Sequence, residues 1–453
     1  MTRRPRPLAA AWGLIVVIAC TSGAPPTPPI SHPDASDWPA YHRTADRAGF
    51  LESGGGSFKG ASEAWRSPEL DGDVYGSPLV VAGKALVATE NNTVYAFDVG
   101  SGRLVWSRHL GTPVDSSTLP CGNISPTSGI TSTMVADRGT VYAVAFLAPA
   151  RHVLFSLSAL DGSVQGQANV DPPGENPMTH QQRAALALGS DRVYIAYGGL
   201  FGDCGRYHGW VVGAPLGGTG ANAVYRVPSG NAAGIWAPSG PAIDPAGSVY
   251  LATGNSFSDS SFDFGNAVVK LSPELVLQDW FAPAEWLRMN DVDGDLGSIG
   301  PLLLSGGLVF QSGKPGTGYL LRAAHLGGLG GAAYTATVCP DGGGVRGGAA
   351  AVPPFVYVPC SSGVVALRID AARPAFSVAW RSDEFGAGPP VVAGHAVWSA
   401  NAAAGVIYAL DPSSGRRLYQ DSAGRMAHFA TPAATDGYVF VAAERQLVSL
   451  KLA

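Results

Sequence analysis

The chain has 453 residues, of which 60 are glycine and 35 are proline; 46% are apolar and only 14% are charged. Disorder needs low hydrophobicity with high charge, and long helices need many Glu, Lys and Arg residues. This composition therefore excludes both and favours short apolar strands separated by turns. The chain carries 29 basic and 34 acidic side chains, and its body has no basic cluster, which excludes nucleic acid and anionic lipid headgroups as expected partners.

The first 37 residues have the composition of an export signal followed by a spacer. Three arginines precede an apolar stretch, residues 8–18, which is too short to span a bilayer, where roughly 20 residues are needed. We predict a signal peptide over residues 1–19, and Val17-Ile18-Ala19-Cys20 resembles a bacterial lipobox in which Cys20 becomes lipidated. Cleavage by an ordinary signal peptidase, without lipid, is the alternative. Residues 20–37 are rich in Pro and Ser and predict an extended linker behind the lipidated cysteine.

A pattern of four short strands recurs along residues 38–453. Its clearest copy covers residues 74–106, with apolar runs at Leu79–Val81, Ala85–Thr89, Val94–Asp98 and Arg103–Trp106. Each run is about as long as a typical strand of ~5 residues, and each connection has hairpin length. Self-similarity at this period predicts an all-β propeller built from four-stranded antiparallel blades.

The last copy of the repeat lacks its fourth, Trp-bearing strand. Ala64-Trp65-Arg66 precedes the first full copy and supplies such a strand, so we expect an N-terminal strand to join the C-terminal blade. This closure leaves no unpaired sheet edge and gives eight blades, with seven blades as the alternative. The Trp residues that end the copies are expected to fill the space between neighbouring sheets.

The cysteines predict two disulfides outside the cytoplasm. If Cys20 carries lipid, an even set remains. Cys339 and Cys360 flank strands of one blade or of two neighbouring blades and are predicted to pair, which leaves Cys121 with Cys204. None of the four has the spacing of a metal or redox site.

The copy at residues 74–106 resembles the repeat of the pyrroloquinoline-quinone (PQQ) enzyme propellers, as does Asp37-Trp38-Pro39-Ala40-Tyr41-His42-Arg43. The resemblance covers roughly residues 37–453 and implies one of two functions. Quinoprotein dehydrogenases hold PQQ and Ca²⁺ near the axis and oxidise alcohols or sugars. Non-catalytic relatives, including BamB-type lipoproteins that assist outer-membrane protein assembly, have no cofactor. The adjacent cysteine pair of the alcohol dehydrogenases is missing here, and no segment matches their Ca²⁺-ligand motifs.

Residues 290–295 contain alternating acids, Asp291, Asp293 and Asp295, whose oxygens are the ligands that a hard cation such as Ca²⁺ prefers. They are a candidate metal site, and a solvated turn capped by aspartates is the alternative. Lys314 lies in a glycine-containing loop that does not satisfy the phosphate-loop pattern, and it is a second candidate for ligand contact.

Residues at the start of each innermost strand should point toward the propeller axis. The repeat alignment predicts this rim to consist of Tyr75, Thr131, Gln182, Arg183, Trp236, Ser298, Arg346 and His428. Such a mixture of aromatic, amide and cationic groups suits a small polar or anionic ligand; a purely structural role is the alternative for each residue.

These patterns predict an exported bacterial lipoprotein, anchored to a membrane outside the cytoplasm and monomeric. It would act without catalytic residues or a required cofactor, as a binding or scaffold module for a protein, peptide or polysaccharide partner. The alternative is a PQQ- and Ca²⁺-dependent quinoprotein oxidoreductase acting on alcohols or sugars. A sugar- or cell-wall-active enzyme is a third hypothesis, because propellers also host glycosidases and lyases.

Overall fold

The computed structural model describes residues 1–2, 36–218, 220–340 and 343–453. Nearly all of the predicted signal peptide, Cys20 and nearly all of the linker lie outside these residues, so those expectations remain predictions. In the unit that spans Pro33–Ala453, the regular secondary structure of the described residues is almost wholly β-strand, as predicted. None of the helices in the described part of the chain has the length and apolarity that crossing a membrane requires.

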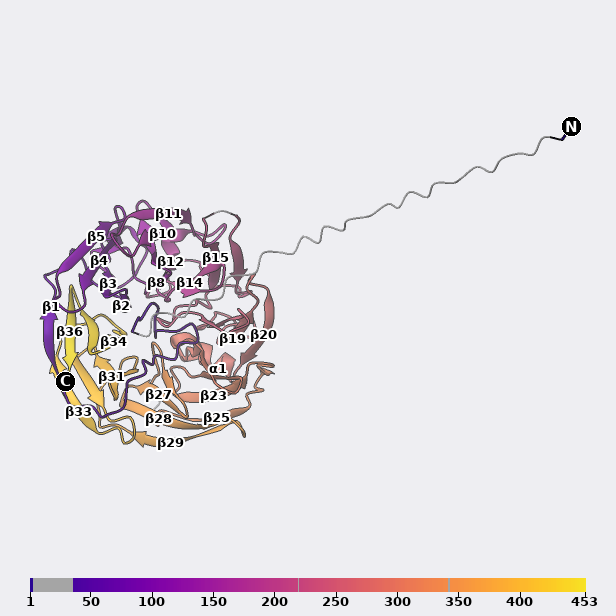
Figure 1. Ribbon diagram of the computed structural model, residues 1–453. Helices are drawn as coiled ribbons and strands as arrows, with labels where there is room; N and C mark the ends of the chain where they lie inside the picture. Colours follow the sequence, from indigo (N-terminus) through magenta and orange to yellow (C-terminus); the bar gives the residue numbers. More distant parts are fainter. Residues whose placement is uncertain (3–35, 219, 341–342) are drawn as a thin grey trace. The chain divides into compact units, whose positions relative to one another are not determined.

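Eight sheets surround a central axis (Figure 1); six of them have four strands and two have five. In each sheet four antiparallel strands form a blade, and in blades 1 to 7 these four follow sequence order from the axis outward. Blade 1 comprises β2 (Leu79–Val81), β3 (Lys84–Ala88), β4 (Thr93–Asp98) and β5 (Leu104–His109). Blade 2 comprises β8 (Val135–Asp137), β9 (Thr140–Leu147), β10 (Arg151–Ser158) and β11 (Val164–Asn169). Blade 3 comprises β13 (Ala187–Leu188), β14 (Arg192–Gly199), β15 (Trp210–Pro215) and β16 (Ala223–Arg226), with β12 (His180–Gln181) also on β14. Blade 4 comprises β17 (Ala242–Ile243), β18 (Val249–Ala252), β19 (Val268–Leu271) and β20 (Leu277–Ala282), extended by β24 (Gly328–Leu329).

The second half of the ring follows the same order. Blade 5 comprises β21 (Leu302–Leu304), β22 (Leu308–Gln311), β23 (Thr317–Arg322) and β25 (Tyr334–Thr337). Blade 6 comprises β26 (Ala350–Val352), β27 (Phe355–Cys360), β28 (Gly363–Asp370) and β29 (Ala375–Arg381). Blade 7 comprises β30 (Val391–Ala393), β31 (Ala396–Asn401), β32 (Val406–Leu410) and β33 (Arg417–Ser422). Blade 8 comprises β34 (Ala433–Thr435), β35 (Tyr438–Ala443), β36 (Gln446–Leu452) and, from the other end of the chain, β1 (Ala61–Arg66).

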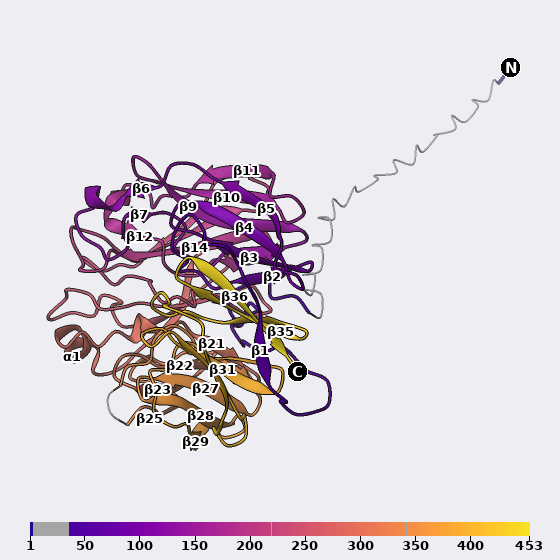
Figure 2. The same ribbon diagram turned by 90° about the vertical axis from the view of Figure 1, so that its left-hand side faces the viewer.

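The ring closes through β1, as the sequence predicted. This strand pairs antiparallel with β36, from Ala61 opposite Leu452 to Arg66 opposite Val448, and Figure 2 shows the two strands side by side. The Trp65 indole reaches the neighbouring blade 1, where its N–H donates to the Val99 carbonyl at 2.8 Å. Eight blades are therefore confirmed, and blade 8 combines β1 with β34, β35 and β36.

The blade-ending Trp residues fill the gaps between neighbouring sheets, as expected. Three of them pack directly on a glycine in the outer turn of the next blade, where an added Cβ would lie only 2.4–2.6 Å from the indole. These pairs are Trp65–Gly102, Trp106–Gly162 and Trp380–Gly415. The three glycines also have φ between 68° and 72°, a conformation that disfavours other residues. The recurring Trp and Gly residues are thus two halves of one contact between blades.

A segment of the chain ahead of β1 crosses the centre of the ring. This inner segment, residues 36–53, hydrogen-bonds to the first strand of one blade after another, in the order in which the blades follow around the axis. Its backbone pairs have N···O distances of 2.7–3.1 Å and are Trp38–Val80, Pro39–Ala136, Ala45–Ile243, Asp46–Leu303, Ala48–Ala351 and Gly49–Val392. Blade 3 is reached by the Arg47 side chain, which donates to Leu186 O at 3.0 Å, and blade 8 by Thr435, whose hydroxyl donates to Ser36 O at 2.7 Å.

The side chains of the inner segment fill the axis. Tyr41, His42 and Arg47 are each no more than 2% exposed. The Arg47 guanidinium donates to three carbonyls, those of Tyr41, Leu186 and Pro241, each at 3.0 Å. Burial, together with the nearby Arg47 charge, lowers the pKa of His42 to about 3, so its imidazole is neutral here. At this level the ring is therefore packed and is not an open channel.

Both predicted disulfides are confirmed. Cys121–Cys204 links the connection between blades 1 and 2 to the middle turn of blade 3, and Cys339–Cys360 links blade 5 to blade 6. The repeat did not predict three local additions: the hairpin β6 (Val114–Asp115) and β7 (Thr127–Ser128), the helix α1 (Trp286–Asp291), and the short 3-10 turns. The 3-10 turns are η1 (Ser116–Thr118), η2 (Pro177–Thr179) and η3 (Leu296–Ser298).

Candidate functional site

One face of the ring carries all the predicted rim residues. Because strands alternate in direction, the connections between blades lie at the same end of the ring as the middle turn of each blade. We call this end the entrance face; in the side view of Figure 2 it is the left-hand side, with β6, β7, β12 and α1. The opposite end holds the turns after each innermost strand, where Ala82 N–H donates to Asp37 and Gly394 N–H to Ser53. The inner segment lies against that opposite end.

Five aromatic and cationic side chains of the entrance face form a row around the axis. The Arg183 guanidinium lies 5.7 Å from the ring centres of both Tyr75 and Phe429. Phe429 lies 6.3 Å from Trp236, and the Lys314 ammonium lies 5.8 Å from the Trp236 ring. Arg183 also donates to the His428 carbonyl at 2.9 Å. The structure thus brings together Tyr75, Arg183, Trp236 and His428 of the predicted rim, and adds Phe429 and Lys314.

Lys314 ends this row as the partner of two aspartates. Its ammonium lies 2.7 Å from Asp293 and 2.6 Å from Asp295, and Asp295 also accepts from the Asn255 N–H at 2.7 Å. Burial acts to lower the Lys314 pKa, but the two carboxylates outweigh it and hold the pKa above its ordinary value. The lysine is therefore charged in this setting.

The predicted Ca²⁺ ligands are not gathered into one cluster. Asp291 ends α1, whereas Asp293 and Asp295 both pair with the Lys314 ammonium. No group of three His, Cys, Asp or Glu side chains suited to a metal occurs in residues 36–453 apart from the undescribed positions 219, 341 and 342. A Ca²⁺ site at these aspartates remains a prediction.

The other predicted rim residues have separate surroundings. The amide of Gln182 donates to Ala184 O and Ala196 O, and the Ser298 hydroxyl donates to Val345 O; both side chains are buried in structural hydrogen bonds. Arg346 is exposed. Thr131 is buried, and its hydroxyl lies 3.1 Å from the Glu90 carboxylate, a residue that the rim prediction did not include.

Glu90 is a buried acid at the middle turn of blade 1. One carboxylate oxygen accepts from the Gly129 N–H at 2.6 Å and from Thr131, whereas the other has no hydrogen-bond partner. Burial raises the pKa of Glu90 to about 7, against the opposing effects of these hydrogen bonds and of the Arg183 charge. Its carboxyl group therefore titrates near neutral pH.

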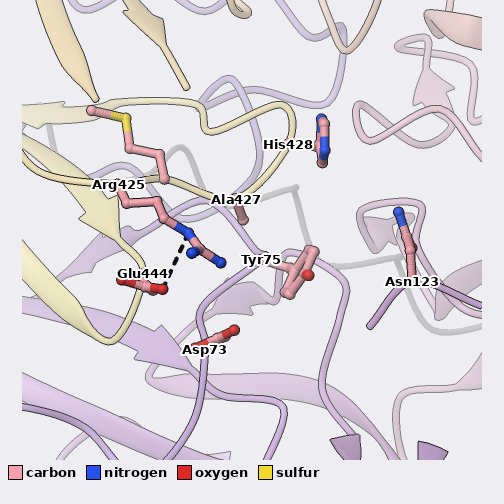
Figure 3. Close-up of a pocket in the computed structure, with 8 residues that line it drawn as sticks. Asp73, Tyr75, Asn123, Arg425, Ala427, His428 and Glu444 are labelled. Carbon is pink, nitrogen blue, oxygen red and sulfur yellow. Dashed lines mark ion pairs between the residues drawn. The ribbon is translucent and has the colours of Figure 1, made fainter. Parts of the chain in front are cut away.

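The entrance face also contains a cavity of about 270 Å³ above blade 8 (Figure 3). Its walls include Asp73, Tyr75, Asn123, Arg425, His428 and Glu444. Only Tyr75 and His428 were predicted. Glu444 could have been found, because Ala442-Ala443-Glu444 occupies the same place in blade 8 as Ala88-Thr89-Glu90 in blade 1. Asp73, Asn123 and Arg425 lie in connections without a repeated pattern.

We predict that Glu90 makes folding stability depend on pH. Between the ordinary carboxyl pKa of about 4.3 and the folded value of about 7, the folded state holds a proton that the unfolded chain has released. Stability should therefore fall as pH rises through this window. Glu90→Gln removes this titration. The free energy of unfolding of the variant, relative to that of the native chain, should therefore be higher at pH 8 than at pH 5, by on the order of 3 kcal/mol.

Urea unfolding of both proteins at the two pH values checks this prediction. Glu69→Gln, which makes the same substitution at a side chain that is 69% exposed, is the control for the substitution itself. A Glu90→Gln stability difference that is the same at pH 5 and pH 8 would contradict the prediction.

Comparisons with known proteins agree with the fold. Residues 59–198 match the family model described as outer membrane protein assembly factor BamB. No curated protein matches the sequence. Among solved structures, a quinohemoprotein alcohol dehydrogenase from Pseudomonas putida HK5 superimposes with a TM-score of 0.71 at 16% identity, over 92% of this chain and 80% of that one.

Two further structures represent both branches of the predicted resemblance. A europium-containing methanol dehydrogenase gives a TM-score of 0.68 at 14% identity, over 92% of this chain and 98% of that one. BamB from Moraxella catarrhalis gives 0.60 at 12% identity, over 87% of this chain and 100% of that one. Identities this low show the fold alone. The resemblance is confirmed: residues 59–198 match the BamB model, and the ring has the propeller fold seen in BamB and in quinoprotein dehydrogenases.

Proposed function

We propose that the chain is an exported propeller that works as a binding module, with its entrance face as the binding surface. It would be tethered outside the cytoplasm through lipid on Cys20 and would act as a monomer. Its partner would be an extracytoplasmic protein, peptide or polysaccharide. The observation that carries the proposal is that the axis is closed at the end opposite the entrance face. Tyr41, His42 and Arg47 fill the axis there, so a ligand can approach it only from the entrance face.

The chemistry of the entrance face supports binding more than catalysis. Two of its basic groups are already paired with acids: Lys314 with Asp293 and Asp295, and Arg425 with Glu444. Aromatic rings stand between these pairs, in the row that runs from Tyr75 through Phe429 to Trp236. Interleaved charges and rings of this kind recognise polar ligands through several weak contacts at once.

A quinoprotein oxidoreductase is the second candidate, favoured by the buried Asp295 that lies beside Lys314 near the Trp236 ring. The residues around Asp295 fit the Ca²⁺ ion of a quinoprotein poorly. Ca²⁺ takes about six to eight oxygen ligands, whereas the Asp295 carboxylate already accepts from Lys314 and from the Asn255 N–H. A divalent cation there would also face the lysine charge.

Titration with PQQ and Ca²⁺ tests the binding-module proposal against this alternative. The purified chain should show no saturable change in quinone absorbance and no reduction of an artificial dye with alcohols or aldoses. A quinoprotein alcohol dehydrogenase run in parallel serves as the positive control. Dye reduction that requires both PQQ and Ca²⁺ would overturn the proposal.

Lipid attachment is tested by expressing the full chain and its Cys20→Ser variant in a bacterial host. The native chain should be found in the membrane fraction, with a mature N-terminus at a lipidated Cys20 by mass spectrometry, because the lipid is its proposed anchor. The variant should be released from that fraction. A mature N-terminus downstream of Cys20 would show the anchor to be wrong.

A further inference from the structure

The cavity above blade 8 is built from four separate connections. Asp73 and Tyr75 follow β1, Asn123 lies between β6 and β7, the stretch from Arg425 to His428 precedes β34, and Glu444 forms the turn between β35 and β36. Figure 3 shows the side chains of Asp73, Tyr75, Arg425 and Glu444 around one space. Its volume of about 270 Å³ is at the small end for a ligand pocket, so it suits one small ring and not a chain of them.

The walls of this cavity are held in place by the backbone. Val74 N–H donates to Glu444 O at 2.8 Å, and Glu90 N–H donates to Asp73 O at 2.9 Å. The His428 carbonyl is held by Arg183. Glu444 itself has φ of 51°, a left-handed conformation that is costly for a residue other than glycine and is kept here by its neighbours. The cavity therefore exists before any ligand arrives.

The charges in the walls argue against a simple ion as the ligand. A cation would be attracted by Asp73 and Glu444 but would meet the Arg425 guanidinium, which lies 3.2 Å from Glu444. An anion would be attracted by Arg425 but would meet two carboxylates. Burial, with the neighbouring Glu444 charge, also raises the Asp73 pKa. A ligand group that donates a hydrogen bond to Asp73 would therefore stabilise the charged form of this carboxylate.

A neutral ligand with adjacent hydroxyl groups can form favourable contacts with the acidic, basic, amide and aromatic side chains that line the cavity. Each hydroxyl can donate to Asp73 or Glu444 and accept from Arg425, and the Asn123 amide can do both. The half-buried Tyr75 ring offers a flat apolar surface to the carbon–hydrogen face of a small ring. A sugar ring combines these two properties in one molecule.

We propose that the cavity lined by Asp73, Tyr75, Asn123, Arg425, His428 and Glu444 binds a single neutral sugar unit of a polysaccharide. This inference rests on the proposed binding function and selects a polysaccharide over a protein as the partner. Asp73 and Glu444 accept from the sugar hydroxyls, Arg425 and Asn123 donate to them, and Tyr75 packs against the ring.

Saturation-transfer NMR of the full chain with glucose, galactose, mannose and N-acetylglucosamine tests whether the cavity binds a neutral sugar. At least one sugar should receive saturation, and its affinity should fall by roughly tenfold in Asp73→Asn and in Glu444→Gln, as expected when a charge-assisted hydrogen bond is lost. Tyr75→Ala should lose the signal and Tyr75→Phe should retain it, which separates stacking from a folding defect. Arg373→Gln, whose parent side chain is 90% exposed in the turn between β28 and β29, is the matched control.

The same samples are titrated with acetate and with methylammonium as charged probes. Neither should compete with the sugar. The inference is overturned if no sugar receives saturation, if the three cavity variants Asp73→Asn, Glu444→Gln and Tyr75→Ala bind as well as the native chain, or if either charged probe displaces the sugar. None of these outcomes contradicts the proposed binding module, because the result that contradicts that proposal is PQQ- and Ca²⁺-dependent dye reduction.

Discussion

The hydrogen bonds between residues 36–53 and the innermost strands are the constraint on which the rest of the structure depends. The first strand of each blade pairs on one side only, so its other edge faces the axis with backbone groups that need partners. The inner segment meets these groups in one blade after another. Because Arg47 adds bonds to blades 3 and 4, a single short stretch fixes the distance of every blade from the axis.

This arrangement couples closure of the ring to the binding face. Blade 8 needs β1, and the chain that leaves β1 carries Asp73 and Tyr75 into the cavity beside Glu444. The Val74–Glu444 hydrogen bond therefore belongs both to the closing blade and to the site. On the axial side, the Tyr41 hydroxyl accepts from Thr431, so the inner segment also touches the connection that carries His428. A ligand in this cavity would bind only to a closed ring.

The fold could be predicted because its unit recurs: the Trp65–Gly102 contact and its equivalents repeat in the sequence as well as in space. The role of the inner segment could not be predicted from the sequence, since its hydrogen-bond partners are spread over all the blades. The rim was predicted less well than the fold, because side chains alternate between faces and a difference of one residue turns a side chain inward. Arg183 faces the axis, whereas its neighbour Gln182 is buried in structural hydrogen bonds. Glu90 and Glu444 occupy equivalent turns, but alternation within strands does not identify turn residues.

Hydrogen–deuterium exchange under native conditions tests the central role of the inner segment most directly. The amides of Ala136, Ile243, Leu303, Ala351 and Val392 donate to this segment, and those of Trp38 and Leu51 donate in the other direction. If the segment holds the blades together, both sets should exchange together and only through global unfolding of the ring. Rapid local exchange of residues 36–53 while the innermost strands stay protected would contradict this role.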